Sequence, residues 1–421
     1  MMKSWKNAFA VYRNPEMTAM LALGFFSALP FVLIFSTLAY WLSDSGVDIR
    51  TLALFSLVRL PYSFKFLWAP YIDRLPLPFL TARFGQRRSW ALFFQLCLIF
   101  LLTGLVHTDP AQNPVLTGAF ALAVAFFSAS QDIVFDAFRI ECFEKNDQGA
   151  ASATYIFGYR LGMFAAGAGA LFLSDYIGWE KVYESFAFLG VAGIFVILGA
   201  KEPLRPCVSG QNNFFRDAVV APVKDFFQKQ EWLPVILFIL TYKLCETTIG
   251  TVTPKLYKEL GFSNVEIALI AKGWGVAATI FGGFAGGVLV ARFGLVKSLM
   301  LCGILQGLSN LPFAVLSMRE HSMLWLTISL ISDNMAAGMA TTAFVAYMSS
   351  LCNTAYTATQ YALLSSLTAL PRDLLSSGSG WLVHFMGWPA FFIFTAFLSL
   401  PSLVILYFLN RRFSTRNDEP E

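Results

Sequence analysis

The chain has 421 residues, of which 57% are hydrophobic and 13% are charged, and its formal net charge is +4. Soluble domains carry about 25% charged residues and about 45–50% apolar ones, so this composition excludes a soluble globular protein. It predicts an all-α integral membrane protein, because a helix satisfies its own backbone hydrogen bonds inside a bilayer. The sequence has no clustered basic segment that would attract nucleic acid, and its six cysteines lack metal-ligand spacing. We therefore expect no nucleic-acid partner, no metal and no other cofactor.

Twelve apolar runs along the chain are long enough to be membrane spans. A helix needs about 20 apolar residues to cross the hydrocarbon core. The first run is too long for the apolar part of a cleavable signal peptide, so we expect it to be retained. Most of the 30 Lys and Arg residues fall on the cytoplasmic side if both termini are cytoplasmic, which predicts that orientation. The predicted spans are 17–42, 51–71, 89–106, 115–138, 150–173, 182–200, 233–254, 264–290, 297–317, 322–347, 357–383 and 388–410.

A short repeat indicates that the chain consists of two related halves. The segments ARFGQRRS (Ala82–Ser89) and ARFGLVKS (Ala291–Ser298) share five identical positions and lie 209 residues apart. Each falls in the predicted turn between the second and third span of its half. Two related six-helix bundles around a central site are typical of secondary transporters. The predicted parts are an N-terminal bundle (1–200), a cytoplasmic linker (201–231), a C-terminal bundle (232–410) and a cytoplasmic tail (411–421).

The fourth span carries unusual charge in the segment SASQDIVFDAFR. Charged groups inside a span cost roughly 2.5–3.5 kcal/mol each and usually face the bundle interior or a transport pathway. We predict that Asp132 is functional and pairs with Arg160 of the fifth span. Asp136 and Arg139 are spaced to pair near the cytoplasmic end, as a structural salt bridge or as a gate latch. Helical periodicity places six residues of the segment on one stripe: Ser128, Gln131, Asp132, Phe135, Asp136 and Arg139.

Other spans add cations and acids to this inventory. Lys65 in the second span could reach the interface or contribute to a site, and Lys243 and Glu246 can compensate each other at i, i+3. All three histidines fall at or beyond the predicted periplasmic helix ends, so carboxylates would have to carry protons in a proton-coupled cycle. The candidate proton-coupling residues are Asp132, Asp136, Glu246 and Asp333. The cations able to hold an anionic ligand are Lys65, Arg160, Lys243 and Lys272.

The basic turn after the second span resembles that of the major facilitator superfamily. In this sequence Asp73 and Arg74 are separated by LPLPFLTARF from the segment Gly85-Gln86-Arg87-Arg88. The resemblance implies the twelve-helix, two-bundle fold of that superfamily. Together with Arg139, the residues Asp73 and Arg74 are the predicted gate residues.

Longer segments resemble the AmpG-type muropeptide permeases within that superfamily. The first half carries GFFSALP (24–30), FKFLWAPYIDR (64–74), SASQDIVFDAFR (128–139) and GYRLGM (158–163). The second half carries YKL (242–244), GILQGLSN (303–310) and TTAFVAYMSSLCNTAYTATQYALLSSL (341–367). The residues that this resemblance implicates are Gln131, Asp132, Asp136, Tyr159, Arg160, Lys243, Lys272 and Gln360.

The resemblance implies a proton-driven importer of the bacterial inner membrane that works by alternating access. Its cargo would be N-acetylglucosaminyl-1,6-anhydro-N-acetylmuramic acid and its peptides, moved from periplasm to cytoplasm for peptidoglycan recycling. In many bacteria this flux also feeds the signal that induces β-lactamase and hence antibiotic resistance. The sugar hydroxyls and acetamides of this cargo suit Gln131, Tyr159 and Asn334, and its carboxylates suit Arg160, Lys243 or Lys272.

Two other functions are weighed against this one. A related permease could carry a different anionic solute, such as a siderophore or an acyl-coenzyme A, and Arg59 could be an adaptation to such cargo. A membrane enzyme is disfavoured, because the sequence has no catalytic Cys/His/Ser set, metal-ligand spacing or phosphate-binding loop. We expect a monomer whose partners are its cargo, protons and the lipid bilayer.

Overall fold

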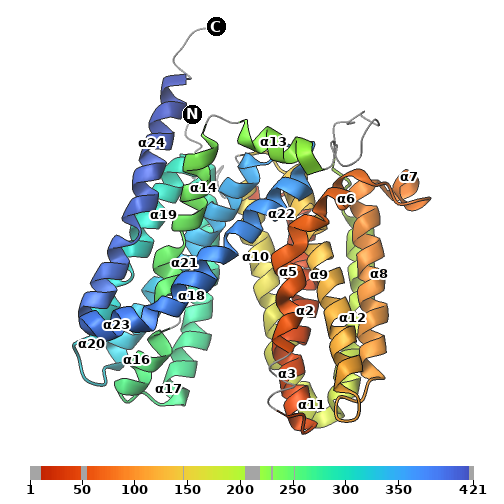
Figure 1. Ribbon diagram of the computed structural model, residues 1–421, viewed down its shortest axis with the longest axis horizontal. Helices are drawn as coiled ribbons and strands as arrows, with labels where there is room; N and C mark the ends of the chain where they lie inside the picture. The colour runs from red at the N-terminus through yellow and green to blue at the C-terminus, as the bar shows by residue number, and fades with distance from the viewer. Residues whose placement is uncertain are drawn as a thin grey trace.

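The computed structural model describes residues 11–48, 55–145, 147–203, 219–228, 231–250 and 252–416, with the backbone alone at 56, 264, 268, 272, 369–377 and 411–416. Within these ranges the chain forms helices joined by turns (Figure 1). The helices gather into two groups that lie side by side, one built before the linker and one after it. This arrangement confirms the predicted all-α fold and is consistent with two six-helix bundles.

The first half follows the predicted spans, except that 51–71 is broken into short pieces. Pro61 and Pro70 each lie at the start of a new short helix, because proline lacks the amide hydrogen needed to continue the preceding one. The elements of this half are η1 (Val11–Arg13), α2 (Pro15–Val32), η2 (Leu33–Thr37), α3 (Leu38–Asp44), η3 (Phe55–Arg59), α5 (Leu60–Phe64), η4 (Lys65–Leu67), α6 (Ala69–Arg74), α7 (Leu80–Phe84), α8 (Gln86–Val106), α9 (Pro114–Cys142), α10 (Gln148–Phe164), η5 (Ala165–Gly169), α11 (Ala170–Ile177) and α12 (Trp179–Gly199).

The second half begins after a short linker helix, α13 (Ala221–Phe227). Its predicted last two spans meet at Gly387, where a sharp turn interrupts α23. The elements of this half are α14 (Trp232–Thr241), α15 (Leu244–Gly250), α16 (Thr253–Glu259), α17 (Asn264–Ala268), η7 (Leu269–Gly275), α18 (Val276–Phe293), α19 (Leu295–Leu308), α20 (Leu311–Ser317), α21 (Met323–Leu351), α22 (Thr357–Leu367), α23 (Ala369–Phe397) and α24 (Leu400–Arg416).

Nine helices in the described part of the chain are long and apolar enough to cross a membrane. The other predicted spans are also helical. The second is the broken series from η3 to α6, the tenth is α21, and the eleventh is α22 with the first part of α23. The structure is therefore consistent with twelve spans.

Glycines with positive φ occupy equivalent turns of the two halves. Gly85 (φ 85°) precedes α8, and Gly294 (φ 80°) precedes α19. Gly178 (φ 78°) and Gly387 (φ 73°) form the turns before the last span of each half. Both pairs have the same 209-residue offset as the ARFG repeat. Because glycine adopts positive φ without a steric penalty, these positions extend the repeat from sequence to backbone conformation.

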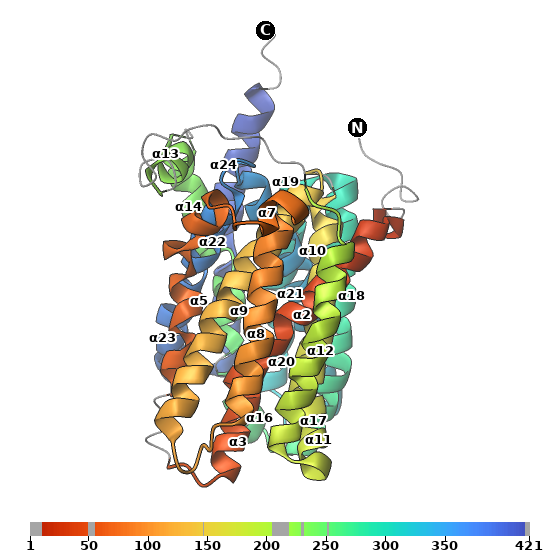
Figure 2. The ribbon, with the colours of Figure 1, turned by 90° about the vertical axis from the view of Figure 1, so that its right-hand side faces the viewer.

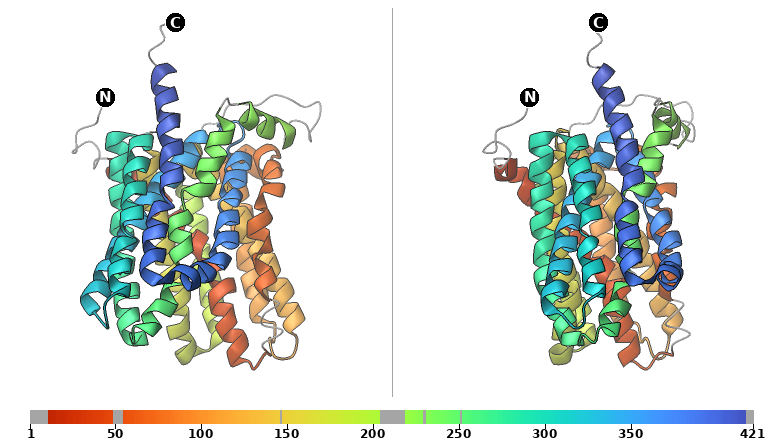
Figure 3. Two further views of the ribbon diagram at one scale, coloured as in Figure 1. Left: turned by 60° about the vertical axis from the view of Figure 1, so that its left-hand side comes forward. Right: turned by 90° about the vertical axis from the view of Figure 1, so that its left-hand side faces the viewer.

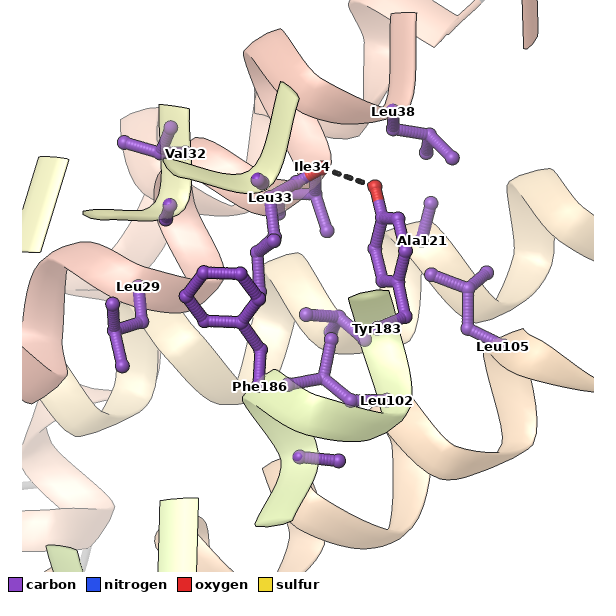
Figure 4. Close-up of a cluster of buried hydrophobic side chains, with 14 of the residues drawn as sticks. Leu29, Val32, Leu33, Ile34, Leu38, Leu102, Leu105, Ala121, Tyr183 and Phe186 are labelled. Carbon is purple, nitrogen blue, oxygen red and sulfur yellow. Dashed lines mark hydrogen bonds between the residues drawn. The ribbon is translucent and has the colours of Figure 1, made fainter. Parts of the chain in front are cut away.

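An apolar cluster fills the first half between α2, α8, α9 and α12 (Figure 4). Tyr183 is fully buried in it, and its hydroxyl donates to the carbonyl oxygen of Leu33 at 2.7 Å. A buried hydroxyl needs such a partner, so the ring supplies apolar area while its polar end stays satisfied.

The halves contact each other at the end of the molecule that carries α13, the start of α2 and the end of α24, which we call the linker end (Figures 1 and 2). There α10 packs on α18 and α21, and α22 packs on α5, η4, α6 and α9 (Figure 3). Gly149 and Gly287 allow the close approach of α10 and α18, since an added Cβ at Gly149 would lie 2.6 Å from Cβ of Val290. This contact closes the linker end.

Gly158→Ala is expected to lower the free energy of unfolding by about 1–3 kcal/mol, as overpacking of a tight contact does. An added Cβ at Gly158 would overlap the carbonyl oxygen of Leu21 on α2, and a backbone atom cannot move aside as a side chain can. The measurement is the unfolding transition of the purified variant in detergent. Gly167→Ala is the matched control, because its added Cβ would lie an ordinary 3.6 Å from Val32. Equal stability of the two variants would contradict the packing role of Gly158.

Candidate functional site

A cavity of about 430 Å³ lies between the two halves. This volume falls in the range of roughly 300–1,000 Å³ typical of small-molecule sites. Its charged lining residues are Arg160 from α10 of the first half and Glu246 and Asp333 from the second half. Its hydroxyl-bearing lining residues are Thr247, Thr253, Tyr257, Thr279 and Thr341. The cavity therefore presents a cation on one wall, and acids with hydrogen-bonding hydroxyls on the other.

The acidic wall holds an ion pair that includes Lys243. Its Nζ lies 2.5 Å from Oε2 of Glu246 and 2.6 Å from Oγ1 of Thr341. The two charged side chains are one helical turn apart, which confirms the predicted i, i+3 pairing. Thr341 uses its hydroxyl to hold the ammonium group on the side of the cavity.

Asp333 and Asn334 reach the cavity from the middle of α21. Oδ1 of Asp333 accepts a hydrogen bond from Nε2 of Gln306 at 3.2 Å. Asn334 accepts one from the Thr279 hydroxyl at 2.9 Å and donates one to the carbonyl oxygen of Leu330 at 2.8 Å. Both side chains are thus held in place by neighbours before any ligand arrives.

Arg160 is exposed to the cavity, and its Nη1 lies 3.9 Å from the sulfur of Met163. The predicted pair between Asp132 and Arg160 is not formed in this structure. Asp132 instead accepts a hydrogen bond from the Ser27 hydroxyl of α2 at 2.5 Å. The charges are separated because Asp132 faces α2, whereas Arg160 faces the second half. Arg160 is therefore available to an anionic ligand.

The other acid of the fourth span shares two cations. Asp136 lies 3.9 Å from Nζ of Lys65 and 3.4 Å from Nη2 of Arg139. The predicted Asp136–Arg139 pair is thus present. Lys65 contacts Asp136 inside the first half and does not extend toward the membrane–water interface.

Gln131 does not share this polar environment. It is fully buried, and its amide donates to Oε1 of Gln95 on α8 at 2.7 Å. Adjacent residues on a helix point in different directions, so Gln131 faces α8 while Asp132 faces α2. Tyr159 lies on the inner side of α10, with its ring 6.3 Å from that of Phe31.

The three predicted gate residues all lie at the linker end where the halves meet. Asp73 accepts hydrogen bonds from the Thr359 amide at 2.7 Å and the Ala358 amide at 3.3 Å. Arg139 donates to the Ser349 hydroxyl of α21 at 2.9 Å. Arg74 lies over the ring of Tyr356, 5.1 Å from its centroid. Each first-half side chain thus contacts the second half directly.

Among the described side chains, Arg160 and Asn334 are the predicted cargo residues that line the cavity. Gln360 is buried at the linker end, where its amide donates to Asp225 of the linker helix at 2.8 Å. It is not among the residues that line the cavity. Lys272 belongs to the π-helical segment η7, and its side chain lies outside the described residues.

Sequence reasoning missed several partners of the charged residues. Glu141 forms a two-point ion pair with the buried Arg87, with distances of 2.6 and 3.0 Å. Glu202 accepts from the amides of Arg87 and Arg88 at 2.8 and 3.0 Å, and burial raises the pKa of this carboxyl above its ordinary value. The sequence did contain a signal for these two acids. The basic turn at Arg87 and Arg88 needs counter-charges when it is buried, and Glu141 and Glu202 follow the ends of predicted spans.

The helical fold and the charged cavity between its halves define a multi-pass membrane transporter rather than an enzyme. The sequence profile of the Major Facilitator Superfamily matches residues 9–372. Transporter AmpG 4 of Rickettsia felis is 39% identical over 407 residues, covering 96% of this chain and 98% of the relative. The anhydromuropeptide permease of Escherichia coli K12 is 37% identical over 398 residues, covering 94% of this chain and 80% of the relative. The chain therefore belongs to the Major Facilitator Superfamily and, within it, to the AmpG group.

Solved structures agree with this fold. The proton:xylose symporter XylE superposes with a TM-score of 0.65 at 11% identity, covering 96% of this chain and 95% of that one. A bacterial homologue of the iron transporter ferroportin, in an outward-facing state, gives a TM-score of 0.64 at 17% identity, covering 93% and 97%. At these identities the likeness concerns the fold alone. The resemblance seen in SASQDIVFDAFR and GYRLGM is confirmed by the full-length relatives.

Proposed function

We propose that this protein imports anhydromuropeptides from the periplasm to the cytoplasm, driven by protons, in the service of peptidoglycan recycling. The observation that carries the proposal is the cavity, whose lining offers a set of hydroxyls and the cation Arg160, which forms no ion pair among the described residues, while Lys243 is paired with the lining residue Glu246. A muropeptide presents carboxylates to the cations and sugar hydroxyls and acetamides to Thr279, Thr341 and Asn334. The relatives in the AmpG group support the same cargo.

The protein also has acidic side chains that could bind and release protons during transport. Glu246 and Asp333 line the cavity directly, while Asp132 and Asp136 belong to the fourth span and are not among its lining residues. In an alternating-access cycle, Asp132 would carry the proton that drives accumulation, and the Glu246–Lys243 pair would open to leave that cation for a cargo carboxylate. Re-formation of the pair would then expel the cargo.

The proposed setting is the bacterial inner membrane with both termini and the linker end in the cytoplasm. The positive-inside asymmetry of the sequence supports this orientation. The described structure would then be closed toward the cytoplasm, since its contacts between halves lie at the linker end. Delivery of muropeptides by this route would also feed the induction of β-lactamase. We propose that the protein works as a monomer.

A second candidate function is transport of another anionic solute, such as a siderophore or an acyl-coenzyme A. The observation that favours it is Arg59, which lines a separate cavity of about 230 Å³ with Phe35 and Phe55. Its guanidinium lies over the Phe35 ring, 5.2 Å from the centroid. This aromatic, cationic pocket could hold an aromatic ring or a phosphate, and a muropeptide has neither.

Uptake by proteoliposomes discriminates between the two candidates. Vesicles with an alkaline interior should accumulate radiolabelled anhydromuropeptide, and a protonophore should abolish the accumulation. An excess of siderophore or acyl-coenzyme A should not compete. Accumulation of a competitor in place of the muropeptide would overturn the proposed cargo, and accumulation that ignores the protonophore would overturn proton coupling.

Arg160→Gln is expected to reduce muropeptide uptake by about 10- to 100-fold, as loss of a hydrogen bond to a charged group does. The fold should persist, because Arg160 is exposed and forms no ion pair among the described residues. The measurement is the initial uptake rate at matched protein density. Lys181→Gln removes an exposed cation at the end opposite to the linker and should leave uptake unchanged. Normal uptake by the Arg160 variant would remove this residue from the cargo site.

A further inference from the structure

The linker helix α13 lies across the linker end beside the start of α22 (Figure 1). It is attached to the second half, because Phe226 is buried in an apolar cluster that also contains Phe238, Tyr347 and Tyr361. The other side of α13 presents Val223 and Phe227 outward. The helix is therefore packed onto the second half and should move with it.

Asp225 of α13 joins the two residues that frame the turn between α21 and α22. Its Oδ1 accepts from Nδ2 of Asn353 at 3.2 Å, and its Oδ2 accepts from Nε2 of Gln360 at 2.8 Å. Gln360 closes the ring, since its Oε1 accepts from the Asn353 amide at 2.7 Å. The same Nε2 also donates to the carbonyl oxygen of Pro222 at 3.0 Å. We call these three residues, Asp225, Asn353 and Gln360, the linker clasp.

The turn held by the linker clasp is the point where the second half meets Asp73 of the first half. Asp73 accepts from the amides of Ala358 and Thr359, and from the Thr359 hydroxyl at 2.8 Å. These donors directly precede Gln360 in the first turn of α22. Hydrogen bonds weaken steeply when their geometry is lost, so a shift of this turn would break the contact with Asp73.

We propose that the linker clasp positions the start of α22 for Asp73, so that the interdomain linker helps to keep the linker end closed. Asp225 and Gln360 thus act as positioning residues for the gate rather than as cargo contacts. The inference goes beyond the proposed cargo, since it concerns the contact between halves whatever solute is carried. Opening of the linker end would require the clasp to loosen or to move as a unit with α22.

Hydrogen–deuterium exchange of the full-length protein in nanodiscs, without cargo, tests this proposal. Asp225→Asn keeps the size of the side chain, but an amide has one acceptor oxygen for the two donors that Asp225 accepts. We expect the amides at the start of α22 to exchange about tenfold faster in this variant. Gln360→Glu should have the same effect, because it places two carboxylates opposite each other.

The double variant D225N/Q360E exchanges donor and acceptor within the clasp. The new amide can donate to the new carboxylate and still accept from Asn353, so part of the protection of α22 should return although the bond from residue 360 to the Pro222 carbonyl oxygen is lost. Gln228→Ala, which removes an exposed amide at the end of α13, should leave exchange unchanged.

Three results would overturn the proposal. These are wild-type exchange at the start of α22 in both single variants, an equal increase in the Gln228 variant, and no recovery in the double variant. None of them depends on which cargo is transported, so failure of the clasp and failure of the muropeptide assignment can be told apart.

Discussion

Arg87→Ala is expected to lower the free energy of unfolding by about 3–5 kcal/mol, the range measured when one partner of a buried ion pair is removed. Arg87 is fully buried, and its Nη2 lies 2.7 Å from Asp73 and 2.6 Å from Glu141. Without the guanidinium, two buried carboxylates lose the positive charge that they share. Asp73 also accepts from the start of α22, so the loss should reach the contact between the halves.

Chemical unfolding in detergent micelles measures this effect. Arg87→Lys should be intermediate, because an ammonium group is a point charge and cannot reproduce the planar, two-sided contact of a guanidinium. Arg83→Ala is the matched control, since Arg83 is exposed and contacts the Phe84 ring at 5.5 Å. That variant should change stability by less than about 1 kcal/mol. Wild-type stability of Arg87→Ala would show that the buried ion pair does not support the fold.

Asp132→Asn is expected to abolish proton-driven accumulation of cargo while the protein stays folded. The amide has the shape of the carboxylate and can still accept the hydrogen bond from Ser27, so the packing of α2 against α9 should survive. It cannot bind and release a proton, and buried carboxylates on a transport pathway are the usual proton carriers in membrane transporters. Lys65 would also lose part of the negative charge that surrounds it.

The informative comparison is between accumulation and exchange in proteoliposomes. In the Asp132 variant, uptake against a gradient should fall to the level of protein-free vesicles. Exchange of labelled for unlabelled cargo, which needs no net proton movement, should continue. Ser27→Ala should keep gradient-driven uptake, because the carboxylate remains. Full accumulation by the Asp132 variant would move the coupling role to Glu246 or Asp333, which line the cavity.

The predicted stripe on the fourth span shows how far helical periodicity can be used. Asp136 and Arg139 form an ion pair, as their i, i+3 spacing indicates, because the two residues lie about one turn apart on the same helix. Gln131, assigned to the same stripe, faces Gln95 of α8 instead. Periodicity gives the direction of a side chain around its own helix axis, and it contains no information about which neighbour stands in that direction.

The predicted pair of Asp132 and Arg160 illustrates the same limit between helices. The bounds of the predicted spans put both residues at similar depth in the membrane, and this shared depth is the basis of the predicted pair. In the structure Asp132 accepts a hydrogen bond from Ser27 of α2 instead. The same helix α2 packs tightly on α10 at Gly158. Arg160 is then left to face the second half across the cavity.

By itself, the sequence determined that this protein is helical, membrane-embedded and built from two related halves. Apolar run length, the 209-residue repeat and the AmpG-like segments are properties of the chain that do not depend on how helices pack. Only the tertiary structure decided that Arg160 borders the cavity, that Gln360 belongs to the linker clasp and that Arg87 joins Asp73 to Glu141. The physical reason is that such contacts join residues far apart in sequence. Their partners depend on the distances and rotations between helices, and neither composition nor periodicity specifies these.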